Sequence, residues 1–321
     1  MLSSEAWVAI GILTFAAVYA ASHHSKSGYK WTKESLELGL ERPPLWVYVN
    51  EGDVNSRFWQ DFGARSSRVL NVPLLNLCYQ TIVEHNGMTY RVEVIRGLQD
   101  LAIRMGGWEA LPSTLRERLA PVGKSELHWI QTAVLAKWGG LWLSPSVICI
   151  QPFPLLPKDK VVGFGTDWTT TYGGVESTGT RAPGTRALWS PYPAHPMMVE
   201  WEERARERLE SKGGGRQVRN DAAQDWIEFS ERYSTLVHSD MELDRKGSSQ
   251  KRIELEDLLA VGMEGALPFS VPRFTRYVAL PWDDLQNRRT FGWILRMSEA
   301  QILESDIVLR RLFTLAGGRA V

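Results

Sequence analysis

Apolar and polar positions follow two periods along the chain, and one central stretch shows both. From Ser125 to Trp138 the apolar residues recur at helical spacing, which predicts an amphipathic helix. Ser125 has a hydroxyl that can accept a hydrogen bond from the first turn, so it is the predicted N-cap. The buried face of this helix is predicted to contain Leu127, Ile130, Val134 and Trp138.

Two glycines end this helix and lead into an apolar strand. Gly139 and Gly140 allow backbone conformations that other residues adopt only with strain, so the helix is predicted to end there. Residues 141–143, which are Leu-Trp-Leu, form a predicted strand, and Trp142 belongs to it. After the interruption Ser144-Pro145-Ser146, a second apolar run covers residues 147–150.

Similar helix and strand patterns alternate along the rest of the chain. Short runs of β-branched and aromatic residues predict strands, and longer runs with helical spacing predict helices. This order predicts an α/β fold, with a mainly parallel sheet and crossover helices. The predicted strands lie at 45–50, 90–95, 161–164 and 187–190, and the helices at 71–86, 97–105, 197–209, 222–233 and 298–315.

An uncharged apolar run at residues 6–22 predicts a membrane anchor. Its length is near the lower limit of about 17 residues for a spanning helix, and Trp7 and Tyr19 lie near its ends, where an aromatic belt would place them. A cleaved signal peptide is one alternative, but the preceding segment contains Glu5 and no basic residue. A buried soluble helix is another, and it would need apolar partners on every side.

The residues around this run indicate an orientation. Lys26, Lys30 and Lys33 follow it, whereas no Lys or Arg precedes it. The positive-inside rule therefore places the globular part on the cytoplasmic or matrix side, and the mitochondrial inner membrane is the suspected setting. The predicted organisation is a tail at 1–5, a transmembrane helix at 6–22, a linker at 23–44, a globular domain at 45–315 and a tail at 316–321.

Composition narrows the function classes. Lys plus Arg and Asp plus Glu number 37 each, so no overall positive charge attracts nucleic acid. An apolar fraction of 44% is sufficient for a large core. Cys78 and Cys149 lie in apolar runs and are predicted to be buried thiols. The Glu and Arg residues between Glu200 and Arg206 are interpreted as ordinary surface pairs on a solvated helix face.

The residues around the two glycines carry a resemblance to a known family. Residues 137–143, which are Lys-Trp-Gly-Gly-Leu-Trp-Leu, resemble the scaffold of the glycosyltransferases related to capsular polysaccharide synthesis proteins and yeast-type mannosyltransferases. The resemblance implies a GT-A (Rossmann-like) nucleotide-sugar transferase fold. It also implies that, in the family, an Asp-x-Asp motif binds a divalent cation on the donor diphosphate. Gly139, Gly140 and Trp142 are the retained scaffold positions.

The charged positions of the family motif are not retained. Aligned on the glycines, the family's first Asp falls on His128, its Arg on Gln131, and its Asp-x-Asp on Ser144, Pro145 and Ser146. Hard divalent cations prefer carboxylate ligands, and serine hydroxyls bring no charge. No metal, cofactor or catalytic residue is therefore predicted. We expect an inactive glycosyltransferase-like subunit of a membrane protein complex, which contacts other subunits and, through residues 6–22, the bilayer.

Two alternatives remain. The chain could be an active glycosyltransferase that uses a basic side chain in place of the metal, and the candidates for this role are Lys124, Lys137 and Arg181. Lys137 is also suited to interact with a helix C-terminus. The other alternative is a viral or secreted structural protein that has reused the fold.

Overall fold

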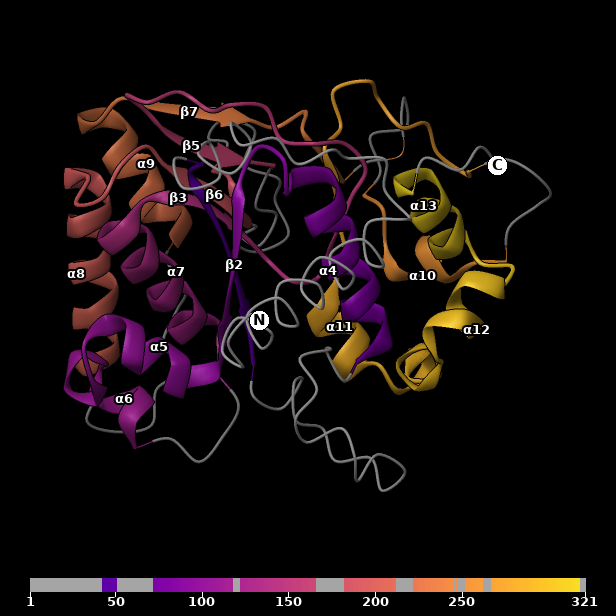
Figure 1. The fold of residues 1–321 in the computed structure, drawn as a ribbon, viewed down its shortest axis with the longest axis horizontal. Coiled ribbons are helices and arrows are strands. Elements are labelled where there is room, and N and C mark those ends of the chain that lie inside the picture. The colour runs from indigo at the N-terminus through magenta and orange to yellow at the C-terminus, as the bar shows by residue number, and fades with distance from the viewer. Residues whose placement is uncertain are drawn as a thin grey trace, which may run out of the picture. The chain divides into compact units, whose positions relative to one another are not determined.

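The computed structural model describes residues 42–50, 72–117, 122–165, 182–211, 222–244, 246, 252–261 and 267–317 (Figure 1). The predicted transmembrane helix at 6–22 lies outside these residues. Among the helices that are described, none is both long enough and apolar enough to cross a bilayer. The description below concerns the compact unit Pro43–Val321.

A six-stranded sheet forms the centre of this unit. Its order is β2-β1-β3-β6-β5-β7, and all its strands run parallel except β6, which is antiparallel to both of its neighbours. The predicted α/β class with a mostly parallel sheet is confirmed. The strands are β1 (Pro44–Val49), β2 (Arg91–Arg96), β3 (Gly140–Leu143), β5 (Val161–Phe164), β6 (Gly184–Ser190) and β7 (Thr235–His238).

A second sheet has three strands, in the order β4-β9-β8. They are β4 (Val147–Cys149), β8 (Glu242–Leu243) and β9 (Tyr277–Ala279). The apolar run that follows Ser144-Pro145-Ser146 is therefore a strand of a different sheet from β3. Cys149 of β4 and Cys78 are buried free thiols, as predicted, and burial raises the pKa of Cys149 to about 12.

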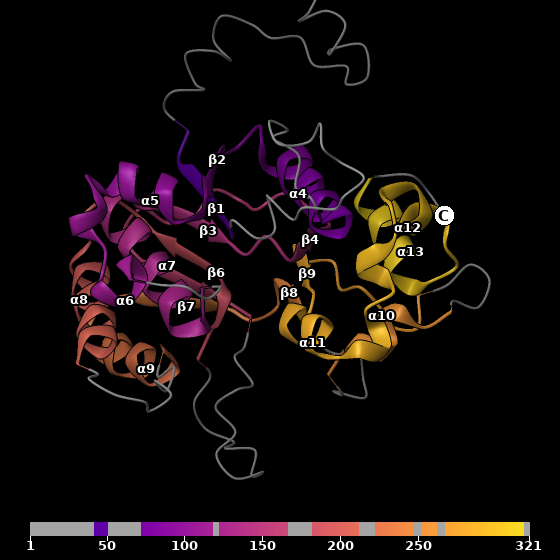
Figure 2. The same cartoon turned by 90° about the horizontal axis from the view of Figure 1, so that it is seen from below.

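Helices cover the central sheet on two sides (Figures 1 and 2). Alternate residues of β1 serve the two sides: Trp46 and Tyr48 join one core cluster, and Leu45 and Val47 join another. On the first side lie α5 (Gly97–Met105), α6 (Ser113–Arg116), α7 (Lys124–Trp138), α8 (Pro196–Glu210) and α9 (Ala222–Arg232). On the other side lie α4 (Pro73–Asn86) and the second sheet. Beyond them, a further core cluster joins α4 and the second sheet to α10 (Leu255–Leu259), α11 (Trp282–Asn287), α12 (Glu299–Glu304) and α13 (Val308–Ala316).

The start of α7 differs from the prediction. The N-cap is Gly123, and its N–H donates to the Glu126 carboxylate at 2.7 Å, so Ser125 lies inside the helix and does not cap it. Leu127 is 37% exposed, although Ile130 and Val134 of the predicted face are fully buried. The first turn of α7 is only partly covered by the rest of the chain, and continuous burial begins at His128.

The single helix predicted at 298–315 is wrong, because the structure has two helices there. Ser298 caps α12 by accepting a hydrogen bond from the Gln301 N–H at 3.2 Å. The chain then leaves the helical conformation at Ser305, and Ile307 forms an isolated bridge with Val261. A contact with a distant segment therefore separates two helices whose residues have a continuous helical pattern.

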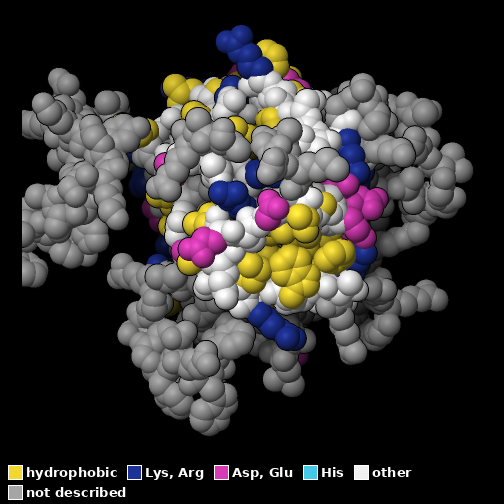
Figure 3. Space-filling model, turned by 90° about the vertical axis from the view of Figure 1, so that its right-hand side faces the viewer, with side chains coloured by type: hydrophobic (Ala, Val, Ile, Leu, Met, Phe, Trp, Pro, Cys, Tyr) yellow, Lys and Arg dark blue, Asp and Glu magenta, His cyan; other side chains and the backbone are white. Residues whose placement is uncertain are grey.

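Apolar side chains gather on the face that bears α12 and α13 (Figure 3). Val261 and Leu303 are 75% and 42% exposed, and Leu315 of α13 is 38% exposed. The Arg310 side chain donates to the Leu303 carbonyl at 3.1 Å, which holds the two helices together at this surface.

Candidate functional site

The glycine pair connects α7 to β3, as predicted. Gly139 has φ 65° and Gly140 has φ 95°, and both values lie in the region that favours glycine. A Cβ at Gly140 would lie 2.3 Å from the Pro44 carbonyl oxygen of β1. The Trp46 indole donates to the Gly139 carbonyl at 2.8 Å. The two glycines therefore allow β3 to pack closely beside β1.

Ser144 and Ser146 lie beyond the carboxyl end of β3, where ligands bind in parallel α/β sheets. Their hydroxyl oxygens are 2.9 Å apart, so one hydroxyl donates to the other. The Ser144 N–H donates to the Arg186 carbonyl at 2.7 Å, and the Ser146 carbonyl accepts from the Leu280 N–H at 2.9 Å. With Pro145 in the turn between them, the two serines link β6 of the large sheet to the end of β9.

Gln131 lies close to this segment. Its side-chain amide donates to the Thr185 carbonyl at 2.9 Å, and the residue is 2% exposed. Because Thr185 and Arg186 are consecutive in β6, the structure brings the Gln131 and Ser144 positions of the motif together. The Gln131 amide fastens α7 to β6.

His128 lies one turn before Gln131 on α7 and packs against α8. Its ring meets the Trp201 ring edge-on, with centroids 5.2 Å apart, and it is 5% exposed. Burial lowers the pKa of His128 to about 4, and the charge of Asp225 opposes this shift in part. His128 is therefore a neutral residue of the core between α7 and α8.

Three buried or half-buried polar residues near the serines, which are Glu242, Arg186 and Tyr277, were not predicted from the sequence. The Glu242 carboxylate is 4% exposed and accepts from the Arg186 guanidinium at 2.8 Å and from the Tyr277 hydroxyl at 3.0 Å. Burial raises the pKa of Glu242, and the Arg186 charge opposes this shift. Gly165, with φ 66°, makes room for the carboxylate, since a Cβ there would lie 1.7 Å from the Glu242 Oε2 atom.

No local sequence signal identifies this cluster, because its members come from β6, β8 and β9. Arg186 is also a basic residue whose backbone lies beside Ser144 in the structure, and it was not among the predicted substitutes for the metal.

The predicted substitutes lie elsewhere or outside the described residues. Lys124 is the first residue of α7. The Lys137 ammonium donates to the carbonyls of Arg104 and Met105, at 3.0 and 2.7 Å. It therefore caps the end of α5, at the opposite end of β3 from Ser144. Arg181 lies outside the described residues.

The predicted surface pairing on α8 is present between Arg204 and Glu200, whose charged groups are 3.7 Å apart. The charged face is nevertheless not simply solvated, which corrects that part of the interpretation. Asp225 of α9 is fully buried, and it accepts from Arg204 at 3.1 Å, from Arg208 and from the Trp201 indole at 3.2 Å. These side chains join α8 to α9. The arrangement is a structural clamp between two helices, since both arginines are satisfied by acids.

Among the described residues, the segment from Ser144 to Ser146 (the serine segment) forms no part of a metal cluster, and a cavity that the structure contains lies elsewhere. Across the described segments between residues 42 and 317, no group of at least three His, Cys, Asp or Glu side chains is placed to hold a metal ion. A cavity of about 410 Å³ lies beside β2 and is lined by Tyr79 of α4 and residues of β2 and α5. It is separate from the serine segment, which follows β3.

No protein-family model matches the chain, and no curated protein sequence matches it. The class that the geometry defines is an α/β domain with a mostly parallel central sheet. The resemblance to glycosyltransferases therefore stays a prediction from the residues around Gly139 and Gly140.

Proposed function

We propose that this chain is a catalytically inactive, glycosyltransferase-like protein of the GT-A type. In this proposal it serves as a membrane-anchored accessory subunit of a membrane protein complex, with the mitochondrial inner membrane as its setting. The α/β fold and the glycine pair between α7 and β3 support the scaffold part of the proposal. The exposed apolar residues Val261, Leu303 and Leu315 support a role in an assembly.

The observation that carries the proposal is the state of the segment beyond β3. The hydroxyl groups of Ser144 and Ser146 bond to each other. The Ser144 N–H donates to the main-chain carbonyl of Arg186, which is a basic residue. A divalent cation prefers carboxylate oxygens, and the two serines supply only uncharged hydroxyl groups. Without the cation, a leaving diphosphate loses several kcal/mol of charge stabilisation.

Arg186 also supports the alternative function, a transferase that works without a metal. A guanidinium can bind a diphosphate through two parallel hydrogen bonds. Against this role, Arg186 is already paired with the buried Glu242 carboxylate, which would have to release it or share it. The inactive protein is therefore the first proposal.

Donor binding distinguishes the two functions. The purified full chain is titrated with UDP-sugars and GDP-sugars, with and without Mn²⁺, and assayed for sugar transfer. We expect no Mn²⁺-dependent binding and no transfer, and we expect Ser144→Ala to change neither result. Tight binding that needs Mn²⁺, or transfer that is lost in Ser144→Ala, would reject the inactive protein. Binding without Mn²⁺ that is lost in Arg186→Ala and is partly kept in Arg186→Lys would favour the alternative.

The anchor is tested separately. Membranes that contain the full chain are extracted at alkaline pH and compared with membranes that contain a chain lacking residues 6–22. We expect only the full chain to stay with the lipid. Release of both forms would contradict the anchored part of the proposal and would leave the prediction about catalysis unaffected.

A further inference from the structure

β2 is the terminal strand of the six-stranded sheet, and only one of its long edges pairs with β1. The Arg91 N–H donates to the Pro43 carbonyl on the β1 side at 3.0 Å. Because successive backbone groups of a strand point to alternate edges, the N–H and C=O groups of Val92 and Val94 and the N–H of Arg96 point away from β1. These groups form the outer edge of β2.

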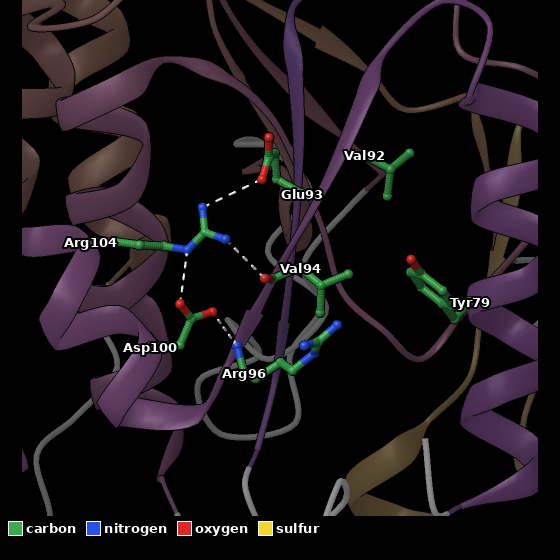
Figure 4. Close-up of a pocket in the computed structure, with 7 residues that line it drawn as sticks. All are labelled: Tyr79, Val92, Glu93, Val94, Arg96, Asp100 and Arg104. Carbon is green, nitrogen blue, oxygen red and sulfur yellow. Dashed lines mark hydrogen bonds and ion pairs between the residues drawn. The ribbon is translucent and has the colours of Figure 1, made fainter. Parts of the chain in front are cut away.

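Side chains of α5 bond to two of these five groups (Figure 4). Asp100 accepts from the Arg96 N–H at 2.9 Å, and Arg104 donates to the Val94 carbonyl at 3.4 Å. The Val92 N–H, the Val92 carbonyl and the Val94 N–H have no hydrogen-bond partner among the described residues. An edge with unpaired groups of this kind is a template for another strand.

The two sides of this edge differ in character. Val92 and Val94 are half-buried and pack on the same core cluster as Tyr79 of α4. On the other side, Glu93 forms an ion pair with Arg104, with the two charged groups 3.4 Å apart. Between α4 and α5 the cavity of about 410 Å³ follows this edge. A strand placed there would have one apolar side and one polar side.

The charges along the edge are unequal. Arg104 is neutralised by Glu93 and Asp100, whereas the exposed Arg96 side chain forms no ion pair with any described residue. Figure 4 shows the Arg96 side chain on the same side of β2 as Tyr79. Burial raises the pKa of Tyr79, and the Arg96 charge opposes this shift. The positive charge of Arg96 is therefore felt by a side chain that lines the cavity. An acidic side chain in the cavity would find its partner in Arg96.

We propose that the outer edge of β2 binds an extended segment of a partner protein, which adds to the sheet as a further strand. The segment has apolar residues at alternate positions against Val92, Val94 and Tyr79, and an acidic residue paired with Arg96. Main-chain hydrogen bonds to Val92 and Val94 hold it, and the alternate side chains select it. The inference goes beyond the proposed function, because this edge needs neither a nucleotide nor a metal.

Peptide binding to the full chain tests the charge preference. The probe is a short fluorescent peptide of alternating Val and Thr that ends in Glu, and the matched peptide ends in Lys. Fluorescence anisotropy is expected to show binding of the Glu peptide that is roughly tenfold tighter than that of the Lys peptide, because like charges oppose association. Arg96→Glu is expected to reverse this order. Equal affinities, or no saturable binding of the Glu peptide, would overturn the proposal.

A second variant tests the edge itself. Val92→Pro removes the outward N–H, and proline is tolerated on edge strands where its nitrogen faces away from the ladder. With Val92→Thr as the control, we expect Val92→Pro to lose peptide binding while its melting temperature stays close to that of the control. In the free chain, the Val92 and Val94 amides should exchange with deuterium rapidly, and bound peptide should slow them. Slow exchange in the free chain would show that the edge is already covered and would also overturn the proposal.

Discussion

The Glu242 carboxylate lies 2.8 Å from the Arg186 guanidinium, and this ion pair joins two separate sheets. Arg186 belongs to β6 of the six-stranded sheet, and Glu242 belongs to β8 of the three-stranded one. The Tyr277 hydroxyl donates a hydrogen bond to the second carboxylate oxygen of Glu242 at 3.0 Å. Burying a charged carboxylate is costly. The strength of this connection between the sheets therefore depends on whether the Glu242 carboxyl group is protonated.

Glu242→Gln is expected to change the pH dependence of stability. Burial raises the pKa of Glu242 in the folded chain, so the folded state holds this proton more tightly than the unfolded state does. Protonated Glu242 therefore contributes to the free energy of unfolding below the unfolded-state pKa of about 4.3, and this contribution is lost as pH rises through the folded-state pKa. The melting temperature of the wild type, relative to that of Glu242→Gln, should fall as pH increases.

Thermal melts at a series of pH values check this direction. Glu228→Gln serves as the control, because Glu228 is on the surface and its pKa is lowered by Arg204 rather than raised. A wild type that gains stability over Glu242→Gln as pH rises would show that the Arg186 charge outweighs burial.

His128→Leu is expected to remove an acid sensitivity. In the folded chain burial lowers the pKa of His128 from 6.5 to about 4, so the unfolded chain binds this proton more readily. The contribution of neutral His128 to the free energy of unfolding is fully present above pH 6.5 and is lost as pH falls toward 4. The loss is about 3 kcal/mol over this interval, on the basis of 1.36 kcal/mol per pKa unit.

Urea unfolding at neutral pH and in mild acid checks this expectation. Between the two conditions, the free energy of unfolding should decrease less for His128→Leu than for the wild type. Equal decreases would mean that the folded chain accepts the proton on His128 as readily as the unfolded chain does.

Part of the fold was predictable because the signals are local. The glycine pair at Gly139 and Gly140 ends a helix through its own backbone conformation, and the strands around it are short apolar runs. The break between α12 and α13 was missed because it depends on the bridge between Ile307 and Val261, which are distant in sequence. The N-cap of α7 was misplaced because Glu126 reaches back to Gly123, and this bond competes with the hydroxyl of Ser125.

The candidate site was predictable only at the positions that follow the glycines. Ser144 lies beyond the carboxyl end of β3 because it follows the strand directly in the chain. His128 is a core residue, since α8 packs over it. The Arg186–Glu242 pair had no sequence signal, because the two residues meet only after β6 and β8 have entered their sheets.

The clamp on Asp225 predicts a large loss of stability when its acid is removed. Asp225→Ala takes the buried partner away from Arg204 and Arg208, and breaking a buried ion pair in this way costs about 3–5 kcal/mol. The matched control is Glu228→Ala, which removes an exposed partner of the same Arg204 and should cost far less, because solvent screens that pair. Urea unfolding measures both. Equal costs would mean that solvent screens the Asp225 pair as fully as the surface pair.

Gly140→Ala is expected to be more destabilising than the same substitution at Gly106. Both glycines have positive φ, 95° at Gly140 and 109° at Gly106, so each alanine carries a backbone strain of about 1–3 kcal/mol. At Gly106 no atom lies within 4 Å of the added Cβ, whereas at Gly140 the Pro44 carbonyl oxygen lies 2.3 Å away. The additional cost at Gly140, about 1–3 kcal/mol for overpacking, reports the close approach of β3 to β1. Urea unfolding of the two variants gives this difference directly, and equal losses of stability would show that β1 can move away from β3 without cost.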